Sequence, residues 1–404
     1  MTVLRFSKNS APIKLFTRAA VALVAVLSIS CSGRNVHKNL TEDVRVLVRE
    51  WTLPTQNKLA ISGDRGVEYS GIALFENTVI FGSRANGLTS MYPQLQRVRW
   101  ELPIQGGVYS ELTVEKSKLY FGGGDGFFYC VNPENGKVVW KYELRDIHVS
   151  KPTVVGGRVF VTTSADTVYA FDAGTGKWLW HYKRRTQSNS TIRGASSPWA
   201  DNQEVLVGMS DGFLINLSVA DGQLKWERKL HWGNKFTDVD AHPMVENQII
   251  YVASYDGAFY ALKRQSGDVI WKQDLGGVKR PIVEETRILF SSSDGTVYAL
   301  QKTNGKILWQ FEVDSGVPTE LAVSDNQIFV GSSFQYFYVL DRGTGKALYR
   351  MNIGYGSGFA TAPVWDSARS RVYALSHGGN LMSFMPRSKS SLPTGIRGAT
   401  DPYL

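Results

Sequence analysis

The side chains that most often carry out catalysis do not form a recognisable motif in this sequence. There is no glycine-rich phosphate loop, no Asp-x-Asp-x-Asp-Gly calcium loop and no Ser-His-Asp order. The histidines are scattered, without the His-x-x-x-His spacing of a zinc site; they are His37, His148, His181, His231, His242 and His377. We therefore expect no catalytic residue, no metal and no cofactor, and favour a binding protein over an enzyme.

The residue with the clearest chemical role is Cys31. Basic residues and no acidic residue precede an apolar run over 19–27, and small residues lead from Ser28 into Cys31. This order is typical of a bacterial secretory signal, and the apolar run is too short to cross a bilayer. The segment resembles a bacterial lipobox, although Ser28 stands where Leu is usual, and the resemblance implies that Cys31 is acylated. The serine that follows implies transport to the outer membrane, while an ordinary cleaved signal with an incidental cysteine stays open.

Composition narrows the class of protein further. The chain has 404 residues, of which 43% are hydrophobic, 12% aromatic and 20% charged. This composition supplies a large core and excludes a disordered chain, a collagen and a coiled coil. Two cysteines exclude a disulfide scaffold, and Cys130, in the apolar segment Phe127–Val131, is expected to be a small buried residue. The net charge of +9 is spread along the chain, so we expect no nucleic-acid partner and interpret Lys183-Arg184-Arg185 as a solvated strand end.

One unit of about forty residues recurs through most of the chain. Its landmark is an aromatic residue, and the intervals between successive landmarks are 49, 40, 40, 46, 45, 38 and 40 residues. Most landmarks follow a turn that contains glycine, as in Thr175-Gly176-Lys177-Trp178-Leu179-Trp180. A period near 40 with four short strands is typical of propeller blades. The landmarks are Trp51, Trp100, Trp140, Trp180, Trp226, Trp271, Trp309 and Tyr349.

Each unit also contains a hairpin signal. Two apolar strands flank a short turn, and an Asp-Gly turn between alternating strands favours a two-residue hairpin loop with positive φ. The Asp-Gly turns are Asp125-Gly126, Asp211-Gly212, Asp256-Gly257 and Asp294-Gly295.

The last unit has only three strands after Tyr349, and Arg45–Leu53, around Trp51, can supply the missing outer strand. Closure of this kind removes open sheet edges. We therefore predict an all-β, eight-bladed β-propeller of four-stranded blades over 45–386, with the ring closed by an N-terminal strand. A signal peptide (1–30) and a tether that starts with the lipidated cysteine (31–44) precede it, and a polar tail (387–404) follows.

Two connections between blades are longer than the repeat requires. The intervals 180→226 and 226→271 exceed forty residues by 6 and 5. Both insertions follow the outer strand of one blade and precede the inner strand of the next, so they lie side by side on one face. Loops that cluster on one face of a rigid scaffold often carry function. The segment Gln56–Tyr69 lengthens a third connection on this face, and its role stays open.

The landmark turn resembles a known docking motif. Ala170-x-Asp172-x-x-Thr175-Gly176-x-x-x-Trp180 matches the eleven-residue motif of quinoprotein-type propellers. In that motif the indole packs against the neighbouring blade, and the glycine allows the backbone to approach closely. The motif occurs in enzymes and non-enzymes, so it implies a fold and not an activity. The sequence lacks the adjacent cysteines that quinoprotein dehydrogenases often carry over their cofactor.

The two longer connections resemble those of one family in particular, the BamB propeller lipoproteins of the β-barrel assembly machinery. Ile192-Arg193-Gly194 and Asp238-Val239-Asp240 match the segments by which that family grips the periplasmic domains of the barrel subunit, BamA. The resemblance implies Ile192 as an apolar anchor and Arg193, Asp238 and Asp240 as charged contacts. Ser190 stands where the family often has a second Leu. The simpler interpretation, in which the aspartates cap turns and Arg193 pairs internally, stays open.

The resemblance implies a non-catalytic scaffold, anchored by lipid to the periplasmic face of the outer membrane, that binds BamA and assists the insertion of β-barrel proteins. Unfolded barrel proteins are possible clients, held at exposed strand edges by β-augmentation. The alternatives are a quinone- or metal-dependent dehydrogenase and a sugar-binding periplasmic propeller, each with a ligand at the hub.

Overall fold

The computed structural model describes residues 46–55, 68–184, 195–230, 242–254 and 257–387. All of these belong to one compact unit, Asn39–Leu404. Every regular element within these ranges is a β-strand. The described ranges also contain no helix long and apolar enough to span a membrane. The predicted signal peptide, the predicted tether and nearly all of the predicted tail lie outside the described residues.

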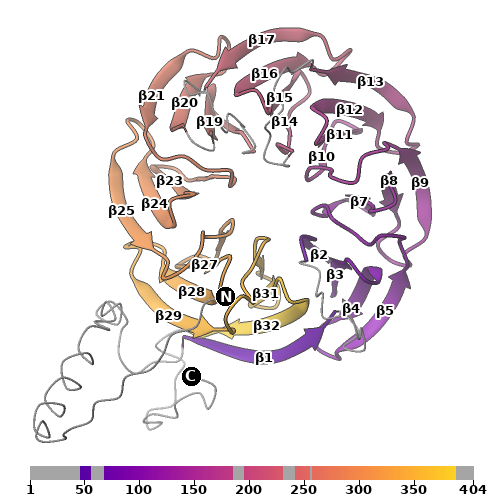
Figure 1. The fold of residues 1–404 in the computed structure, drawn as a ribbon, viewed down its shortest axis with the longest axis vertical. Helices are drawn as coiled ribbons and strands as arrows, with labels where there is room; N and C mark the ends of the chain where they lie inside the picture. Colours follow the sequence, from indigo (N-terminus) through magenta and orange to yellow (C-terminus); the bar gives the residue numbers. More distant parts are fainter. Residues whose placement is uncertain (1–45, 56–67, 185–194, 231–241, 255–256, 388–404) are drawn as a thin grey trace, which may run out of the picture. The chain divides into compact units, whose positions relative to one another are not determined.

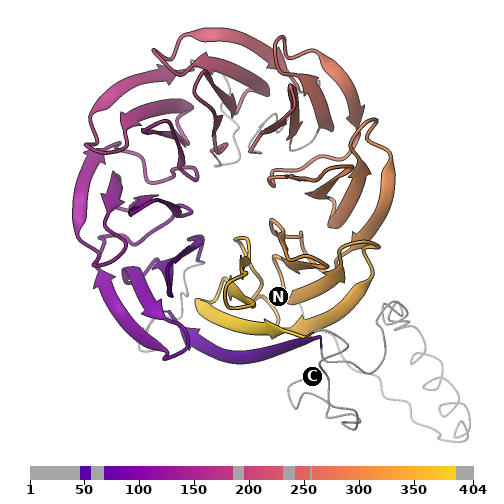
Figure 2. The same ribbon diagram turned by 180° about the vertical axis from the view of Figure 1, so that it is seen from behind.

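The strands form eight antiparallel sheets of four strands, arranged as blades in a ring (Figure 1). Figure 2 shows the same ring from behind. The predicted all-β, eight-bladed propeller of four-stranded blades is therefore confirmed. In blades 1 to 7 the innermost strand comes first in the sequence and the outermost strand comes last.

The first four blades follow one another directly along the chain. Blade 1 comprises β2 (Ile72–Phe75), β3 (Thr78–Ser83), β4 (Gly87–Tyr92) and β5 (Arg97–Leu102). Blade 2 comprises β6 (Thr113–Glu115), β7 (Lys118–Gly122), β8 (Phe127–Val131) and β9 (Val138–Glu143). Blade 3 comprises β10 (Thr153–Val155), β11 (Arg158–Thr163), β12 (Thr167–Asp172) and β13 (Trp178–Lys183). Blade 4 comprises β14 (Trp199–Ala200), β15 (Glu204–Gly208), β16 (Phe213–Ser218) and β17 (Leu224–Lys229).

The remaining blades complete the ring. Blade 5 comprises β18 (Met244–Glu246), β19 (Ile249–Ala253), β20 (Phe259–Lys263) and β21 (Val269–Gln273). Blade 6 comprises β22 (Ile282–Val283), β23 (Arg287–Ser291), β24 (Thr296–Gln301) and β25 (Ile307–Glu312). Blade 7 comprises β26 (Ala322–Val323), β27 (Gln327–Gly331), β28 (Tyr336–Asp341) and β29 (Ala347–Asn352). Blade 8 comprises β30 (Val364–Asp366), β31 (Arg371–Leu375), β32 (Asn380–Pro386) and β1 (Leu47–Pro54).

Blade 8 contains strands from both ends of the described chain. Strand β1 pairs antiparallel with β32, with Leu47 opposite Pro386 and Trp51 opposite Ser383. The outermost strand of this blade is therefore the first strand in the described part of the chain.

The turn inside each blade differs from the predicted two-residue loop. In blade 2 the strands end at Gly122 and resume at Phe127, and the Gly123 amide donates to the Phe127 carbonyl at 2.8 Å. Only the second turn position has positive φ, +81° at Gly126, whereas a type I′ turn needs positive φ at both central residues. The hairpin is present, but its loop is longer than the Asp-Gly pair suggested.

The hydrophobic core lies between neighbouring sheets rather than at one centre. Between blades 2 and 3, the rings of Phe128 and Phe171 stack with centroids 5.8 Å apart. Cys130 lies in the same cluster, is fully buried, and stands opposite Trp140 across the pairing of β8 with β9. Burial raises the pKa of its thiol to about 11, so Cys130 fills space as predicted.

The docking motif joins neighbouring blades, because its indole contacts the next blade and its turn glycine contacts the preceding one. The indole of Trp180 donates to the Val219 carbonyl of blade 4 at 2.9 Å, and Trp100 donates to Pro133 of blade 2 in the same way. The turn glycine of each motif faces the preceding indole: a Cβ placed on Gly176 would lie 2.5 Å from the Trp140 ring. The spacing of the landmarks therefore reflects one contact repeated from blade to blade.

Candidate functional site

The residues predicted to bind a partner or a lipid all lie outside the described residues. They are Ile192, Arg193, Asp238, Asp240 and Cys31. What the structure describes are the points where the two longer connections leave blades 3 and 4 and enter blades 4 and 5. These points lie on the face of the propeller where outer strands end and the next inner strands begin, which we call the loop face.

The first connection leaves blade 3 at Arg184, which is clamped by blade 4. Its Nε atom lies 2.5 Å from Asp211 Oδ2 and its Nη1 atom 2.7 Å from Glu227 Oε2. The guanidinium stacks over the Phe213 ring at 4.5 Å, and only 12% of the side chain is exposed. Burial alone would lower the pKa of Arg184, but the hydrogen bonds to the two carboxylates raise it overall. The interpretation of Arg184 as part of a solvated strand end is therefore wrong, because its partners lie in the next blade.

The same connection enters blade 4 through three hydrogen bonds. The Ser196 hydroxyl accepts the Gly208 amide at 3.2 Å, and the Ser197 hydroxyl accepts the Lys151 amide at 3.2 Å. Thr153 of blade 3 donates its hydroxyl to the Pro198 carbonyl. Both ends of the connection are thus fixed to the framework.

One turn of blade 4 holds the start of both connections. Asp211 binds Arg184, and the next residue, Gly212, accepts the amide of Leu230 at 2.8 Å, where the second connection leaves blade 4. Tyr260 of blade 5 also donates to the Leu230 carbonyl. The structure therefore places the starts of the two connections side by side, while the loops themselves, whose adjacency the spacing predicts, lie outside the described residues.

A repeated hydroxyl fixes the start of several inner strands. The Ser110 hydroxyl accepts the Gly122 amide at 2.7 Å, and the Ser150 hydroxyl accepts the Thr162 amide at 3.0 Å. Ser196 and Thr319 act in the same way towards Gly208 and Gly331. The inner strands lie nearest the centre of the propeller (Figure 1), and the residues at the next position act on one another there. We call them the axial ring: Glu111, Lys151, Ser197, His242, Arg280 and Glu320.

The charges of the axial ring are arranged in neighbouring pairs. Lys151 Nζ lies 3.0 Å from Glu111 Oε2, between blades 3 and 2. Between blades 6 and 7, the Arg280 amide donates to Glu320 Oε1 at 3.3 Å, and Arg280 Nε lies 3.9 Å from Glu320 Oε2. The corresponding positions in blades 8 and 1 hold the small residues Ala362 and Gly71.

Burial and mutual repulsion set the protonation of the ring. Burial, followed by the negative charge of Glu111, raises the pKa of Glu320. Glu111 itself keeps a lowered pKa, because Lys151 outweighs the effect of burial. Burial first, then the charges of Arg280 and Lys151, hold the pKa of His242 well below its usual value. His242 is therefore neutral at pH 7, and its buried Nδ1 atom has no hydrogen-bond partner among the described residues.

The donor set of the ring does not fit the quinoprotein cofactor site expected under the dehydrogenase alternative. That alternative predicts carboxylates and amides gathered around a metal ion. The axial ring offers two carboxylates, Glu111 of blade 2 and Glu320 of blade 7, and no amide side chain. Each carboxylate lies beside a cation, and blades 8 and 1 between them contribute only Ala362 and Gly71. Among the described residues, no three histidine, cysteine or acidic side chains stand close enough to hold a metal.

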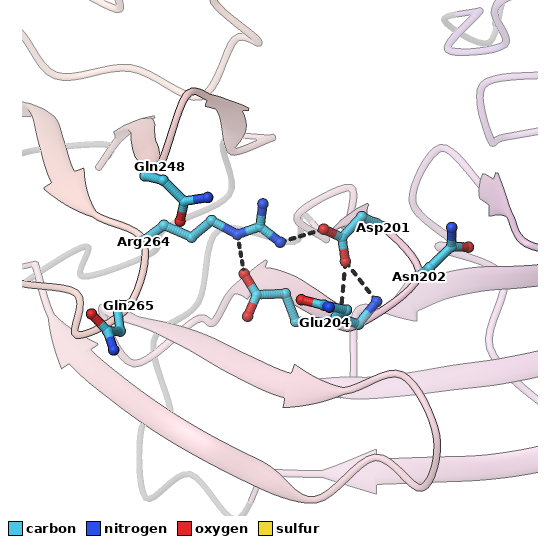
Figure 3. A pocket seen from close by; sticks show the side chains of 7 residues that line it. Asp201, Asn202, Glu204, Gln248, Arg264 and Gln265 are labelled. Atoms are coloured by element: carbon cyan, nitrogen blue, oxygen red, sulfur yellow. Dashed lines mark hydrogen bonds and ion pairs between the residues drawn. The ribbon is translucent and has the colours of Figure 1, made fainter.

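A polar cavity of about 720 Å³ opens on the opposite face, between blades 4 and 5 (Figure 3). Arg264 crosses it and binds Asp201 and Glu204 of the preceding blade. An equivalent bridge joins Arg342 to Glu284 at 2.7 Å beside a similar cavity between blades 6 and 7. Because the arrangement repeats and its charges are paired, it is best explained as a clamp between blades.

Comparison with solved structures defines the class of fold. The crystal structure of BamB from Moraxella catarrhalis matches with a TM-score of 0.71, at 21% identity, over 84% of this chain and all of that chain. Quinohemoprotein alcohol dehydrogenase from Comamonas testosteroni matches with a TM-score of 0.62, at 14% identity, over 87% of this chain and 79% of that one. The protein is thus an eight-bladed propeller of the class that these two proteins share, a class that contains both an assembly factor and an enzyme.

The sequence identifies the family within that class. A family model described as "Outer membrane protein assembly factor BamB" matches residues 94–311 and 293–387, and the chain belongs to this family. A BamB of Aliivibrio fischeri is 37% identical over 183 residues, 44% of this chain and 47% of that protein. A BamB of Legionella pneumophila is 34% identical over 88 residues, 20% of this chain and 23% of that protein. The matched segments span less than half the length of these two curated relatives. The resemblance inferred from the loops and the docking motif is confirmed.

Proposed function

We propose that this protein is a non-catalytic scaffold lipoprotein of the outer-membrane β-barrel assembly machinery. In this role it binds the periplasmic domains of the barrel subunit, BamA, and assists the insertion of β-barrel proteins. Membership of the BamB family over most of the propeller is the observation that carries the proposal. The adjacent, firmly held ends of the two longer connections support it, because an interface built from two loops needs a fixed distance between them.

The contact that we propose has Ile192 as its apolar anchor and Arg193, Asp238 and Asp240 as groups that set orientation. The test is co-purification of BamA with the native, membrane-anchored protein. We expect Arg193→Glu with Asp238→Lys to abolish retention. The matched control makes the same changes of charge, Lys177→Glu with Glu134→Lys, at exposed turns on the opposite face, and should leave retention unchanged. Retention that survives the Arg193 and Asp238 reversal rejects this contact.

We also propose that acylated Cys31 anchors the chain to the periplasmic face of the outer membrane. Several acyl chains on one residue give stable attachment, since each buried methylene contributes about 0.8 kcal/mol. Cys31→Ser should move the protein from the outer-membrane fraction to the soluble periplasmic fraction. A variant protein that stays in the membrane fraction contradicts the anchor.

Unfolded barrel proteins are the proposed clients, held by β-augmentation at outer strand edges. Exposed aliphatic side chains on these strands support the proposal. They are Val138, Val139, Val269, Ile270, Ile307 and Leu308. Crosslinking from Val139 to an arrested barrel precursor tests it, with exposed Arg145 on the loop face as the control position.

A dehydrogenase activity is not part of the proposal, because the axial ring lacks the donor set that such a cofactor needs. Incubation with pyrroloquinoline quinone and Ca²⁺ should leave the melting temperature unchanged. A rise in that temperature overturns the non-catalytic assignment.

A further inference from the structure

Two neighbouring, partly exposed cations at the axis, Lys279 and Arg280, have no carboxylate within about 3 Å among the described residues, unlike other cations of the fold. Arg280 Nε lies 3.9 Å from Glu320, and its Nη1 and Nη2 atoms make no hydrogen bond in the described part of the chain. Lys279 makes no ion pair with any described residue. By contrast, Lys151 and Arg184 each lie within 3.0 Å of a carboxylate. The guanidinium of Arg280 is also accessible, with 39% of the side chain exposed.

The surrounding charges do not neutralise this pair. The charge of Lys279 acts on Glu111, Glu320 and His377, so the ammonium group lies within electrostatic range of residues on blades 2, 7 and 8. Glu111 is already engaged by Lys151 at 3.0 Å, and His242 is neutral. Among the described residues, the axis therefore holds three cations, Lys151, Lys279 and Arg280, against two carboxylates, Glu111 and Glu320. Together with unused guanidinium donors, this excess favours an anionic group from outside the chain.

The axial ring is continuous with the surface that carries the two longer connections. Ser197 and His242 belong to the ring, and each stands directly after one of the two connections. Both connections therefore re-enter the described framework at residues of the axial ring.

The rest of the loop face also has the composition of a protein interface. Phe334 and Tyr355 meet edge to face with centroids 4.5 Å apart, and 82% of Tyr355 is exposed. Tyr69, which is half exposed, lies beside His377, and Tyr109 accepts a hydrogen bond from Arg84 at 2.8 Å. Exposed aromatic and arginine side chains are enriched at protein interfaces, so a protein is favoured over a free small anion as the source of the negative charge.

We propose that Arg280 and Lys279 receive an acidic side chain of the protein that binds the loop face, as a contact separate from the two longer connections. This inference rests on the proposed function. A carboxylate fits the planar donor fork of Arg280, and Lys279 adds a second positive charge beside it. Glu320 lies beside the backbone amide and the Nε atom of Arg280. The Nη1 and Nη2 atoms of Arg280 are therefore left to bind the partner.

The test measures how much barrel subunit co-purifies with the native, membrane-anchored protein. We expect Lys279→Glu with Arg280→Glu to reduce retention by at least about tenfold, because a like-charged group would then face the partner's carboxylate. Lys279→Arg with Arg280→Lys, which keeps both charges, should restore most of it. The control is Lys177→Glu with Lys306→Glu, which makes the same change of charge at exposed turns on the opposite face and should have no effect.

Each outcome separates this contact from the proposed function. If the wild-type protein retains no barrel subunit, the proposed function fails. If the wild type retains it and the axial reversal retains it equally, only the present inference is overturned. If the charge-reversed variant melts at a lower temperature than the wild type, the neutral variant Arg280→Gln with Lys279→Gln is used in its place. Retention of the barrel subunit by the neutral variant must then be lower than by the wild type and less dependent on salt.

A second arm examines the source of the anion. The purified wild-type protein is titrated with citrate and with inorganic phosphate, and its melting temperature is recorded. We expect no rise at millimolar concentrations, because one small anion cannot use the surrounding aromatic surface. The protein contact is overturned if the anion raises the melting temperature of the wild type but not of the Lys279→Glu, Arg280→Glu variant, and both proteins retain the barrel subunit equally. The ligand is then a free small anion.

Discussion

At the scale of single residues, the contact between a turn glycine and the indole of the preceding blade is a close approach that recurs along the chain. Gly176 has φ of +73°, and a Cβ there would lie 2.5 Å from the Trp140 ring. Gly157 has a similar φ of +76°, but nothing lies within 4 Å of its Cβ position. The two glycines therefore separate the cost of positive φ from the cost of crowding.

We expect Gly176→Ala to lower the free energy of unfolding by about 2–4 kcal/mol, the sum of backbone strain and overpacking against Trp140. Gly157→Ala should cost only about 1 kcal/mol, from backbone strain alone. Chemical denaturation of both variants measures the difference. Equal losses would mean that the indole can move aside without cost.

His242 of the axial ring makes the stability of the fold depend on pH. His242 has a pKa well below its usual value in the folded protein, so below about pH 6.5 the unfolded chain binds one more proton than the folded one. Stability is therefore complete above the unfolded pKa and is lost as the pH falls through it.

We expect stability to fall below pH 6.5 by at most about 1.4 kcal/mol per pH unit for this one proton. His242→Gln should make the dependence shallower, and part of the remaining slope belongs to His377, whose pKa burial also lowers. Melting temperatures between pH 5 and 7.5 provide the measurement. A wild-type slope that persists unchanged in His242→Gln assigns the proton to another group.

At the scale of elements, the indole of an outer strand is the link between blades, but its hydrogen bond is not always made. Trp180 donates to the Val219 carbonyl at 2.9 Å, whereas the buried Nε1 atom of Trp309 has no partner among the described residues. Both indoles face the turn glycine of the next blade, Gly222 and Gly345 respectively. The two tryptophans therefore differ in the hydrogen bond and not in the type of packing.

Replacement of each tryptophan by phenylalanine isolates the hydrogen bond. Trp180→Phe removes a donor and leaves a buried carbonyl unpaired, whereas Trp309→Phe removes a donor that was already unpaired. We expect Trp180→Phe to cost about 1–3 kcal/mol more of the free energy of unfolding. Denaturant titration measures both, and a larger loss for Trp309→Phe would contradict the reasoning.

The elements also show which features can be read from the sequence and which cannot. The spacing of aromatic landmarks predicted the blades because one contact repeats along the chain. The role of Arg184 was missed because its partners Asp211 and Glu227 lie 27 and 43 residues away in the next blade. The axial ring does have a sequence signal, because each of its residues precedes a Leu or Pro just before an inner strand. The signal becomes visible only when the repeats are compared with one another and their inner strands are known to share one axis. The proposed contacts at Ile192, Arg193, Asp238 and Asp240 stay predictions, since they lie outside the described residues.

At the scale of the whole molecule, stability depends on the ring being closed. Each core cluster lies between neighbouring sheets, so an open ring would leave one sheet face and one edge uncovered. Strand β1 covers the edge of β32, and its Trp51 packs with Tyr373 and other residues of the cluster between blades 8 and 1. Arg371 adds a link to Glu50 at 2.7 Å. The first strand thus stabilises a blade whose other strands come from the far end of the chain.

Removal of β1 should therefore destabilise the whole propeller and not only its N-terminal region. Two soluble variants form the comparison: one begins at Asn39 and keeps β1, and the other begins at Gln56 and lacks it. We expect the second variant to melt at a lower temperature and to associate through the uncovered edge of β32, since an unpaired edge strand is a template for pairing with another chain. Addition of a peptide of residues 45–55 should restore the monomer, because the peptide can take the place of β1. Calorimetry and light scattering measure both effects, and a monomeric Gln56 variant with an unchanged melting temperature would show that blade 8 is stable without its outer strand.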